Sequence, residues 1–176
     1  MDWLFFLESS IAGLATGALY SLVALGFVII YKATRVINFA IGEIMMISAY
    51  LFLTFAGILG WHPLVALIIA VIGGGILGGI IEKTIIRPML GESPIAVIMV
   101  TIGLSNILVG SAQIFWGGGP RVLPAFLPTE PIFIGELYVS PKIAYSALIA
   151  IGVLACYLVY FRFSRGGVAL RATASD

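Results

Sequence analysis

The side chains of this sequence that can do chemistry gather in two short stretches, the first of which surrounds a lone glutamate. The stretch NFAIGE runs from Asn38 to Glu43, and Glu43 follows Arg35 by eight residues. On a regular helix that separation is ~12 Å, which would place the carboxylate inside a hydrocarbon layer, where ionisation costs several kcal/mol without a partner or water. We expect Glu43 to face protein or water, with Gly42 on a narrow face one turn from Asn38. The alternative is a helix that begins later, leaving Glu43 near the interface to pair with Lys32 or Arg35.

The second stretch is a stripe of amides and small residues along one face of a helix expected over residues 95–116. Its members are Gly103, Asn106, Gly110 and Gln113, spaced i, i+3, i+7 and i+10, with Thr101 and Ser105 nearby. Small residues let helices approach closely in lipid, and polar side chains can hydrogen-bond across them. The stripe therefore predicts either tight helix packing or a polar pathway lined by Asn106 and Gln113.

No group of residues in the sequence has the pattern of a catalytic, metal or cofactor site. A phosphate-binding P-loop needs glycine directly before Lys-Ser/Thr, whereas the nearest run, GGIIEKT at residues 78–84, has Glu82 there. His62 stands alone in a turn, which is typical of a structural or solvated histidine, and Cys156 is expected to be a small apolar residue. We therefore expect no enzyme and no cofactor, and energy for any transport must come from a partner.

Composition shows which kind of structure must position these residues. The chain has 176 residues, of which 61% are hydrophobic and 10% charged, and its mean hydropathy is +1.18. Soluble domains are roughly 45–50% apolar and about 25% charged, so water is an unsuitable solvent for this chain. A single cysteine excludes an intrachain disulfide, and a net charge of +1 leaves no basic excess for nucleic acid.

Five long apolar stretches are each close to the ~20 residues that cross a bilayer as a helix. They cover approximately residues 11–31, 36–59, 64–81, 95–116 and 143–161. Pro63, Ser93-Pro94 and Ser140-Pro141 have the pattern of helix starts, and Arg87-Pro88 that of an end. The predicted fold class is all-α, a polytopic membrane helix bundle with about five transmembrane helices.

Basic residues are distributed unevenly between the two sides that this topology defines. One side receives Lys32, Arg35, Lys83, Arg87, Arg162, Arg165 and Arg171, and the other only Arg121 and Lys142. Because cytoplasmic loops carry the excess of Lys and Arg, we expect the N-terminus outside and the C-terminus inside.

Glycines inside the spans predict close helix packing. The third span carries two overlapping GxxxG pairs, Gly74/Gly78 and Gly75/Gly79, a pattern that brings helix backbones together in lipid. Outside the spans, residues 117–141 form a proline-rich outer loop, in which IFI and LYV flank Gly135-Glu136 and predict a short β-hairpin.

Several blocks of the sequence resemble one transporter family. GLATGALYSLVALG at residues 13–26 and INFAIGE at 37–43 are similar to the opening of the inner-membrane permeases of branched-chain amino acid ABC transporters. EKTIIRP at 82–88, TIGLS at 101–105 and FWG at 115–117 look like later blocks, and RGGVALRATASD at 165–176 like the start of the cytoplasmic coupling segment. Ile41 stands where many members carry a histidine, so no role of an imidazole carries over to it.

The resemblance implies a function and a set of partners. It implies a permease subunit that passes branched-chain or similar aliphatic amino acids across the bacterial inner membrane. The expected partners are cytoplasmic ATP-binding subunits, a second homologous or identical permease subunit and a periplasmic substrate-binding protein. Residues 162–176 would begin the segment that contacts the ATPase, with Arg165, Arg171 and Asp176 as coupling candidates. The outer loop would cap the outer mouth or receive the binding protein.

Members of the family continue beyond residue 176 into further membrane helices. We therefore expect residues 1–176 to be a single transmembrane domain that is incomplete at its C-terminal end. Two other functions remain open: a channel-like or ion-coupled carrier of small solutes such as urea and amides, in which Glu43 would be the coupling group, or a non-transporting membrane assembly subunit.

Overall fold

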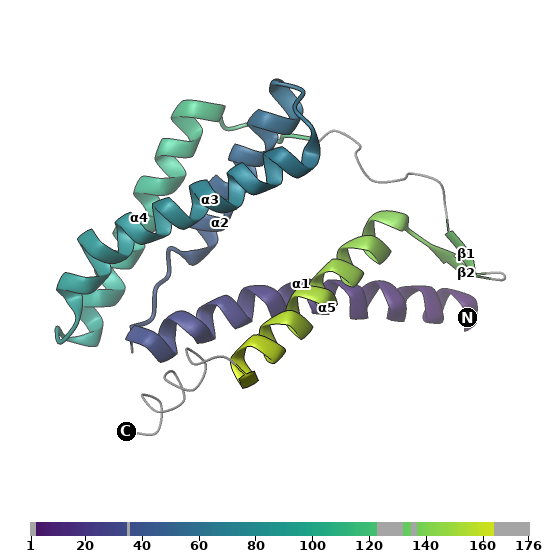
Figure 1. Ribbon diagram of the computed structural model, residues 1–176, viewed down its shortest axis with the longest axis horizontal. Helices are drawn as coiled ribbons and strands as arrows, with labels where there is room; N and C mark the ends of the chain where they lie inside the picture. The colour runs from purple at the N-terminus through teal and green to yellow at the C-terminus, as the bar shows by residue number, and fades with distance from the viewer. Residues whose placement is uncertain (1–2, 35, 123–131, 135–136, 164–176) are drawn as a thin grey trace. The chain divides into compact units, whose positions relative to one another are not determined.

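Long helices dominate the structure, a computed structural model that describes residues 3–34, 36–122, 132–134 and 137–163 (Figure 1). The chain forms two compact units. One comprises Met1–Ala33 together with Ala125–Asp176, and the other comprises Thr34–Pro124. The predicted all-α class is confirmed, with one small hairpin added to the helices.

The first unit contains two long helices and the hairpin. Helix α1 spans Trp3–Thr34 and helix α5 spans Pro141–Phe163. Strands β1 (Ile132–Ile134) and β2 (Leu137–Val139) pair antiparallel, with Phe133 opposite Tyr138. The hairpin predicted in the outer loop is therefore confirmed, and so is the predicted start of α5 at Pro141.

The described part of the second unit contains the helices α2, α3 and α4, of which α2 and α3 continue into short irregular turns. Helix α2 (Ile41–Phe52) runs into the π-helical η1 (Leu53–Ile58), and α4 spans Pro94–Trp116. Helix α3 (Pro63–Ile81) is followed by the π-helical η2 (Glu82–Ile86) and the 3₁₀ turn η3 (Arg87–Met89). Helix α2 packs most extensively against α3 and also contacts α4, and the three lie side by side in Figure 1.

Proline and a side-chain cap begin both α3 and α4; the sequence predicts both prolines and the Ser93 cap, whereas the cap at His62 was not predicted. Ser93 Oγ accepts a hydrogen bond from the backbone N–H of Ala96 at 3.3 Å, and Pro94 occupies the first turn of α4. His62 Nδ1 accepts from the Leu64 N–H at 3.3 Å before Pro63. His62 thus has a structural role, because it satisfies one of the N–H groups that a helix start leaves without a partner.

The buried core of the second unit lies where α2 begins, where α3 ends and along the first part of α4. It consists of Val36, Ala40, Ile81, Ile86, Val97, Leu104 and Leu108. Many large apolar side chains outside it are exposed, among them Leu67, Ile68, Val71 and Ile72 on α3. An apolar surface of this extent suits lipid and would be unstable in water.

Within the described residues, four helical segments are long and apolar enough to cross a membrane, and α5 contributes a shorter apolar stretch, Ile143–Val159. The four are Phe5–Lys32, Ile41–Ile58, Pro63–Met89 and Pro94–Trp116. The chain is therefore a multi-pass membrane protein, as its composition predicts.

The close approach of α2 and α3 depends on two adjacent glycines. A methyl group on Gly73 would lie 2.6 Å from Leu51 Cδ1, and one on Gly74 would overlap Ser48 Oγ and lie 3.3 Å from Ser48 Cβ. Among the described residues, no such neighbour lies within 4 Å of a methyl group added at Gly75, Gly78 or Gly79. Of the two predicted GxxxG pairs, only Gly74 meets a neighbouring helix within this unit, and Gly73 was not predicted.

Candidate functional site

The stretch before α2 is a turn and does not continue a helix. Asn38 is 4% exposed, and its Oδ1 accepts a hydrogen bond of 2.9 Å from the N–H of the fully buried Ala40. The first helical bond of α2 then joins the Ile44 N–H to the Ala40 carbonyl at 3.1 Å. The expected regular helix that would carry Glu43 ~12 Å beyond Arg35 is therefore wrong. The Asn38 side chain bonds to the local backbone, which competes with helix formation before Ile41.

Glu43 lies in the first turn of α2, where the helix dipole favours a carboxylate. The late helix start that was the alternative expectation is confirmed. Oxygen Oε2 of Glu43 is nevertheless buried and has no hydrogen-bond partner among the described residues, whereas the neighbouring Gly42 is exposed. Its pairing with Arg35 or Lys32 stays a prediction, because Arg35 lies outside the described residues and Lys32 belongs to the other unit. A buried, unpartnered carboxylate oxygen is costly, so the site suits an additional polar group or water.

The polar residues of α4 divide between two faces. Thr101 is fully buried, its hydroxyl donates to the Ile98 carbonyl at 3.1 Å, and it shares the packed face with Leu104. Ser105 is half-buried. Asn106 is exposed and donates from Nδ2 to the Ile102 carbonyl of its own helix at 3.0 Å.

Gln113 is also exposed, about two turns further along the same helix. The two amides therefore lie on a face that α2 and α3 leave open in this unit. That face is available to further helices or to water, and the structure places only Thr101 of the predicted polar set in the packed interior of α4.

The ends of α2 and α4 are joined by a cluster of aromatic and polar groups. The rings of Tyr50 and Trp116 stack with centroids 5.2 Å apart. Trp116 Nε1 donates to Thr54 Oγ1 at 2.8 Å, and the Thr54 hydroxyl donates in turn to the Tyr50 carbonyl at 2.8 Å. Arg121 donates from Nη2 to the Trp116 carbonyl. Trp116 thus ties the turn that carries Arg121 to η1.

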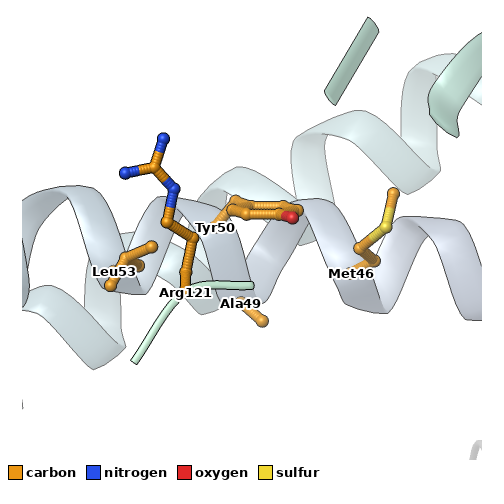
Figure 2. Close-up of a pocket in the computed structure, with 5 residues that line it drawn as sticks. All are labelled: Met46, Ala49, Tyr50, Leu53 and Arg121. Carbon is orange, nitrogen blue, oxygen red and sulfur yellow. The ribbon is translucent and has the colours of Figure 1, made fainter. Parts of the chain in front are cut away.

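Arg121 borders two hollows at this end of the unit. The first, about 220 Å³, is lined by Met46, Ala49, Tyr50, Leu53 and Arg121 (Figure 2). The second, about 420 Å³, shares Leu53 and Arg121 with it and is lined further by Gly57, Ile58, Pro120 and Val122. One guanidinium beside apolar walls is an arrangement that can hold an anionic group attached to an aliphatic one.

Sequence reasoning missed this cluster. In the sequence, Arg121 is noted only as one of the two basic residues on the sparsely charged side of the membrane. Tyr50 and Thr54 lie one helical turn apart, but nothing else in the sequence indicates that they contact Trp116. The run FWG drew attention to Trp116 only through its family resemblance. The coupling candidates Arg165, Arg171 and Asp176 lie outside the described residues, and within those residues no group of three or more His, Cys, Asp or Glu side chains could hold a metal ion.

Comparison with known proteins decides the family. A family model described as "Branched-chain amino acid transport system / permease component" matches residues 9–176. The chain belongs to this family. The family resemblance seen in the sequence is therefore confirmed.

Curated relatives of the family match nearly the whole chain. It is 28% identical over 185 residues to the high-affinity branched-chain amino acid transport system permease protein BraD of Pseudomonas aeruginosa, covering 97% of this chain and 60% of the relative. It is 28% identical over 193 residues to the corresponding protein LivH of Escherichia coli K12 and 29% identical to LivH of Salmonella typhimurium, in each case covering 99% of this chain and 61% of the relative. The chain thus spans about three fifths of the length of these relatives. No solved structure matches it significantly.

Proposed function

We propose that the chain is a permease subunit of an ATP-driven importer that moves branched-chain or similar aliphatic amino acids across the bacterial inner membrane. The match to the permease family over residues 9–176 carries this proposal. It is supported by helices long and apolar enough to form the wall of a membrane pathway. The relatives are transport permeases and not enzymes, so ATP hydrolysis belongs to separate cytoplasmic subunits.

The importer would contain the partners that its chemistry requires. Two permease subunits, identical or homologous, would form the pathway, cytoplasmic ATP-binding subunits would drive it, and a periplasmic binding protein would deliver the amino acid. The seven-to-two distribution of basic residues supports an outer N-terminus and an inner C-terminus. Residues 162–176 would then begin the contact with the ATPase, through Arg165, Arg171 and Asp176, and residues 117–141 would form the outer loop. Within this scheme, residues 1–176 belong to one transmembrane domain.

The polar residues of the second unit have different roles in this scheme. Asn38 shapes the turn before α2, and Thr101 packs α4 against its neighbours. Gly42 leaves room beside α2 and Ser105 is half-buried on α4, and the exposed amides of Asn106 and Gln113 would face further helices or water. Glu43 is the residue of the set most suited to the pathway, because its buried Oε2 has no hydrogen-bond partner among the described residues.

Uptake of radiolabelled leucine by cells tests this proposal. Deletion of the gene should abolish high-affinity uptake, and expression of the intact protein should restore it. Glu43→Gln should lower the uptake rate at least about tenfold at equal membrane abundance, whereas the exposed Glu92→Gln should not change it. Unchanged leucine uptake in the deletion strain would contradict the transport function, and unchanged uptake with Glu43→Gln would remove Glu43 from the pathway.

The buried Glu43 oxygen also favours a second candidate, an ion-coupled carrier in which this carboxylate takes up a proton or cation. Such a carrier works without an ATPase and responds to the proton or sodium gradient. Collapse of both gradients at constant ATP distinguishes the two, because it stops the carrier and leaves the ATP-driven importer active.

A further inference from the structure

We infer that Arg121 and the apolar hollow beside it form a subsite that holds a transported amino acid by its carboxylate and its aliphatic side chain. The inference rests on the proposed function and names the residues that would recognise the substrate class. It concerns the ends of α2 and α4, away from Glu43 and the other polar residues considered above.

The walls of the hollow suit an aliphatic side chain. Met46, Ala49 and Leu53 line it from successive turns of α2 and the start of η1, together with Tyr50 (Figure 2). Its volume of about 220 Å³ is below the roughly 300–1,000 Å³ of pockets for drug-sized ligands, which suits a small solute. Methionine adapts its shape to different apolar groups, so leucine, isoleucine and valine could share one wall.

The guanidinium of Arg121 suits a carboxylate. A guanidinium has five N–H donors in a fixed fork, and among the described residues one of them, on Nη2, bonds to the Trp116 carbonyl. Arg121 lines the hollow with Leu53 and Tyr50, and Figure 2 shows its side chain drawn between theirs. A planar carboxylate can accept two parallel bonds from such a fork, a strong and geometrically specific interaction.

The surrounding contacts hold Arg121 in place before any ligand binds. Trp116 is fixed by its stack on Tyr50 and by its bond to Thr54. Gly117 follows with φ +82°, a left-handed conformation that glycine adopts without strain and that turns the chain back towards Arg121. A preorganised guanidinium loses less conformational entropy on binding than a free arginine side chain does.

The position of the subsite agrees with an entry role. The second hollow, about 420 Å³, shares the lining residues Leu53 and Arg121 with the first. With the orientation proposed above, both hollows lie at the outer end of the helices. An amino acid released by the binding protein would meet Arg121 before the apolar interior.

Cysteine protection in the complete reconstituted transporter tests the subsite. Because Cys156 is the only cysteine, Cys156→Ala gives a background for Met46→Cys in the hollow and for Met45→Cys as the matched control, since exposed Met45 does not line it. Leucine should slow modification of Met46→Cys by a water-soluble methanethiosulfonate at least about fivefold. Isopentylamine, which has the same branched chain without the carboxylate, should not slow it, and neither compound should protect Met45→Cys.

Variants of Arg121 separate carboxylate recognition from simple occupancy. Adding Arg121→Gln should raise the leucine concentration needed for protection at least about tenfold, as expected for loss of a charge-assisted bidentate pair, and Arg121→Lys should raise it less. Equal protection by leucine and isopentylamine, or unchanged protection with Arg121→Gln, would overturn the subsite. Absence of ATP-driven leucine uptake by the unmodified transporter would instead overturn the proposed function, so the two failures are distinguishable.

Discussion

Replacing Gly74 with alanine should separate α2 from α3, because the added methyl group has no room beside Ser48. That methyl would overlap Ser48 Oγ and lie 3.3 Å from Ser48 Cβ, just inside the 3.4 Å at which ordinary contact begins. Ser48 Oγ donates to the Ile44 carbonyl at 2.9 Å, so rotating the hydroxyl away gives up that bond. Overpacking of this kind costs about 1–3 kcal/mol. Alanine recovers roughly 0.5–1 kcal/mol over glycine inside a helix.

Gly75→Ala is the matched control, because nothing lies within 4 Å of its added methyl group and the gain in helix propensity is the same. The free energy of unfolding, measured by SDS titration in dodecyl maltoside micelles, should therefore be lower for Gly74→Ala than for Gly75→Ala by about 1–3 kcal/mol. Ser48→Ala removes the overlapping oxygen and should restore most of that difference in the double variant. The close contact between Gly74 and Ser48 would be refuted if the two glycine variants were equally stable. It would also be refuted if Ser48→Ala further lowered the stability of Gly74→Ala.

Three further changes test local contacts by the same unfolding measurement. Asn38→Ala should cost about 1–3 kcal/mol, because it leaves the buried N–H of Ala40 without an acceptor; a loss matching that of an exposed residue would contradict the turn. Trp116→Phe keeps the stack on Tyr50 but removes the donor to Thr54, and should cost about 0.5–1.5 kcal/mol. Thr54→Val should lower the stability of the Trp116→Phe variant by little, because both changes remove the same bond. If the two losses of stability simply added, they would argue against the bond between Trp116 and Thr54. His62→Ala should cost about 0.5–1 kcal/mol as the loss of an exposed N-cap, and an unchanged stability would show that the cap contributes nothing.

The sequence predicts the helices of this protein well where local rules decide them. Proline at the first helical position and a capping side chain mark the starts of α3 and α4, and both signals depend only on neighbouring residues. The hairpin is similarly local, since IFI and LYV pair across Gly135-Glu136. Apolar length predicts the spans, because a helix must satisfy its own backbone in lipid.

The positions of the functional side chains depend on contacts that hydropathy does not report. Apolar residues from Val36 onward predict a span that begins there, but α2 begins only at Ile41. The bond from the Ala40 N–H to the Asn38 side chain forms a turn in place of the first part of that helix. The contact at Gly73 and Gly74 depends on which face of α3 meets α2, and two overlapping GxxxG pairs point to different faces. Arg121 reaches the Trp116 carbonyl only because Gly117 turns the chain back after α4.

The most direct measurement of the central claim is leucine uptake into vesicles that contain the complete transporter. The purified permease subunits would be reconstituted with the ATP-binding subunits, the binding protein supplied on one side and ATP on the other. We predict uptake that requires ATP and the binding protein and that stops when the ATP-binding subunits are omitted. Uptake that continues without ATP or without those subunits, or a complete assembly that moves no amino acid, would contradict the account.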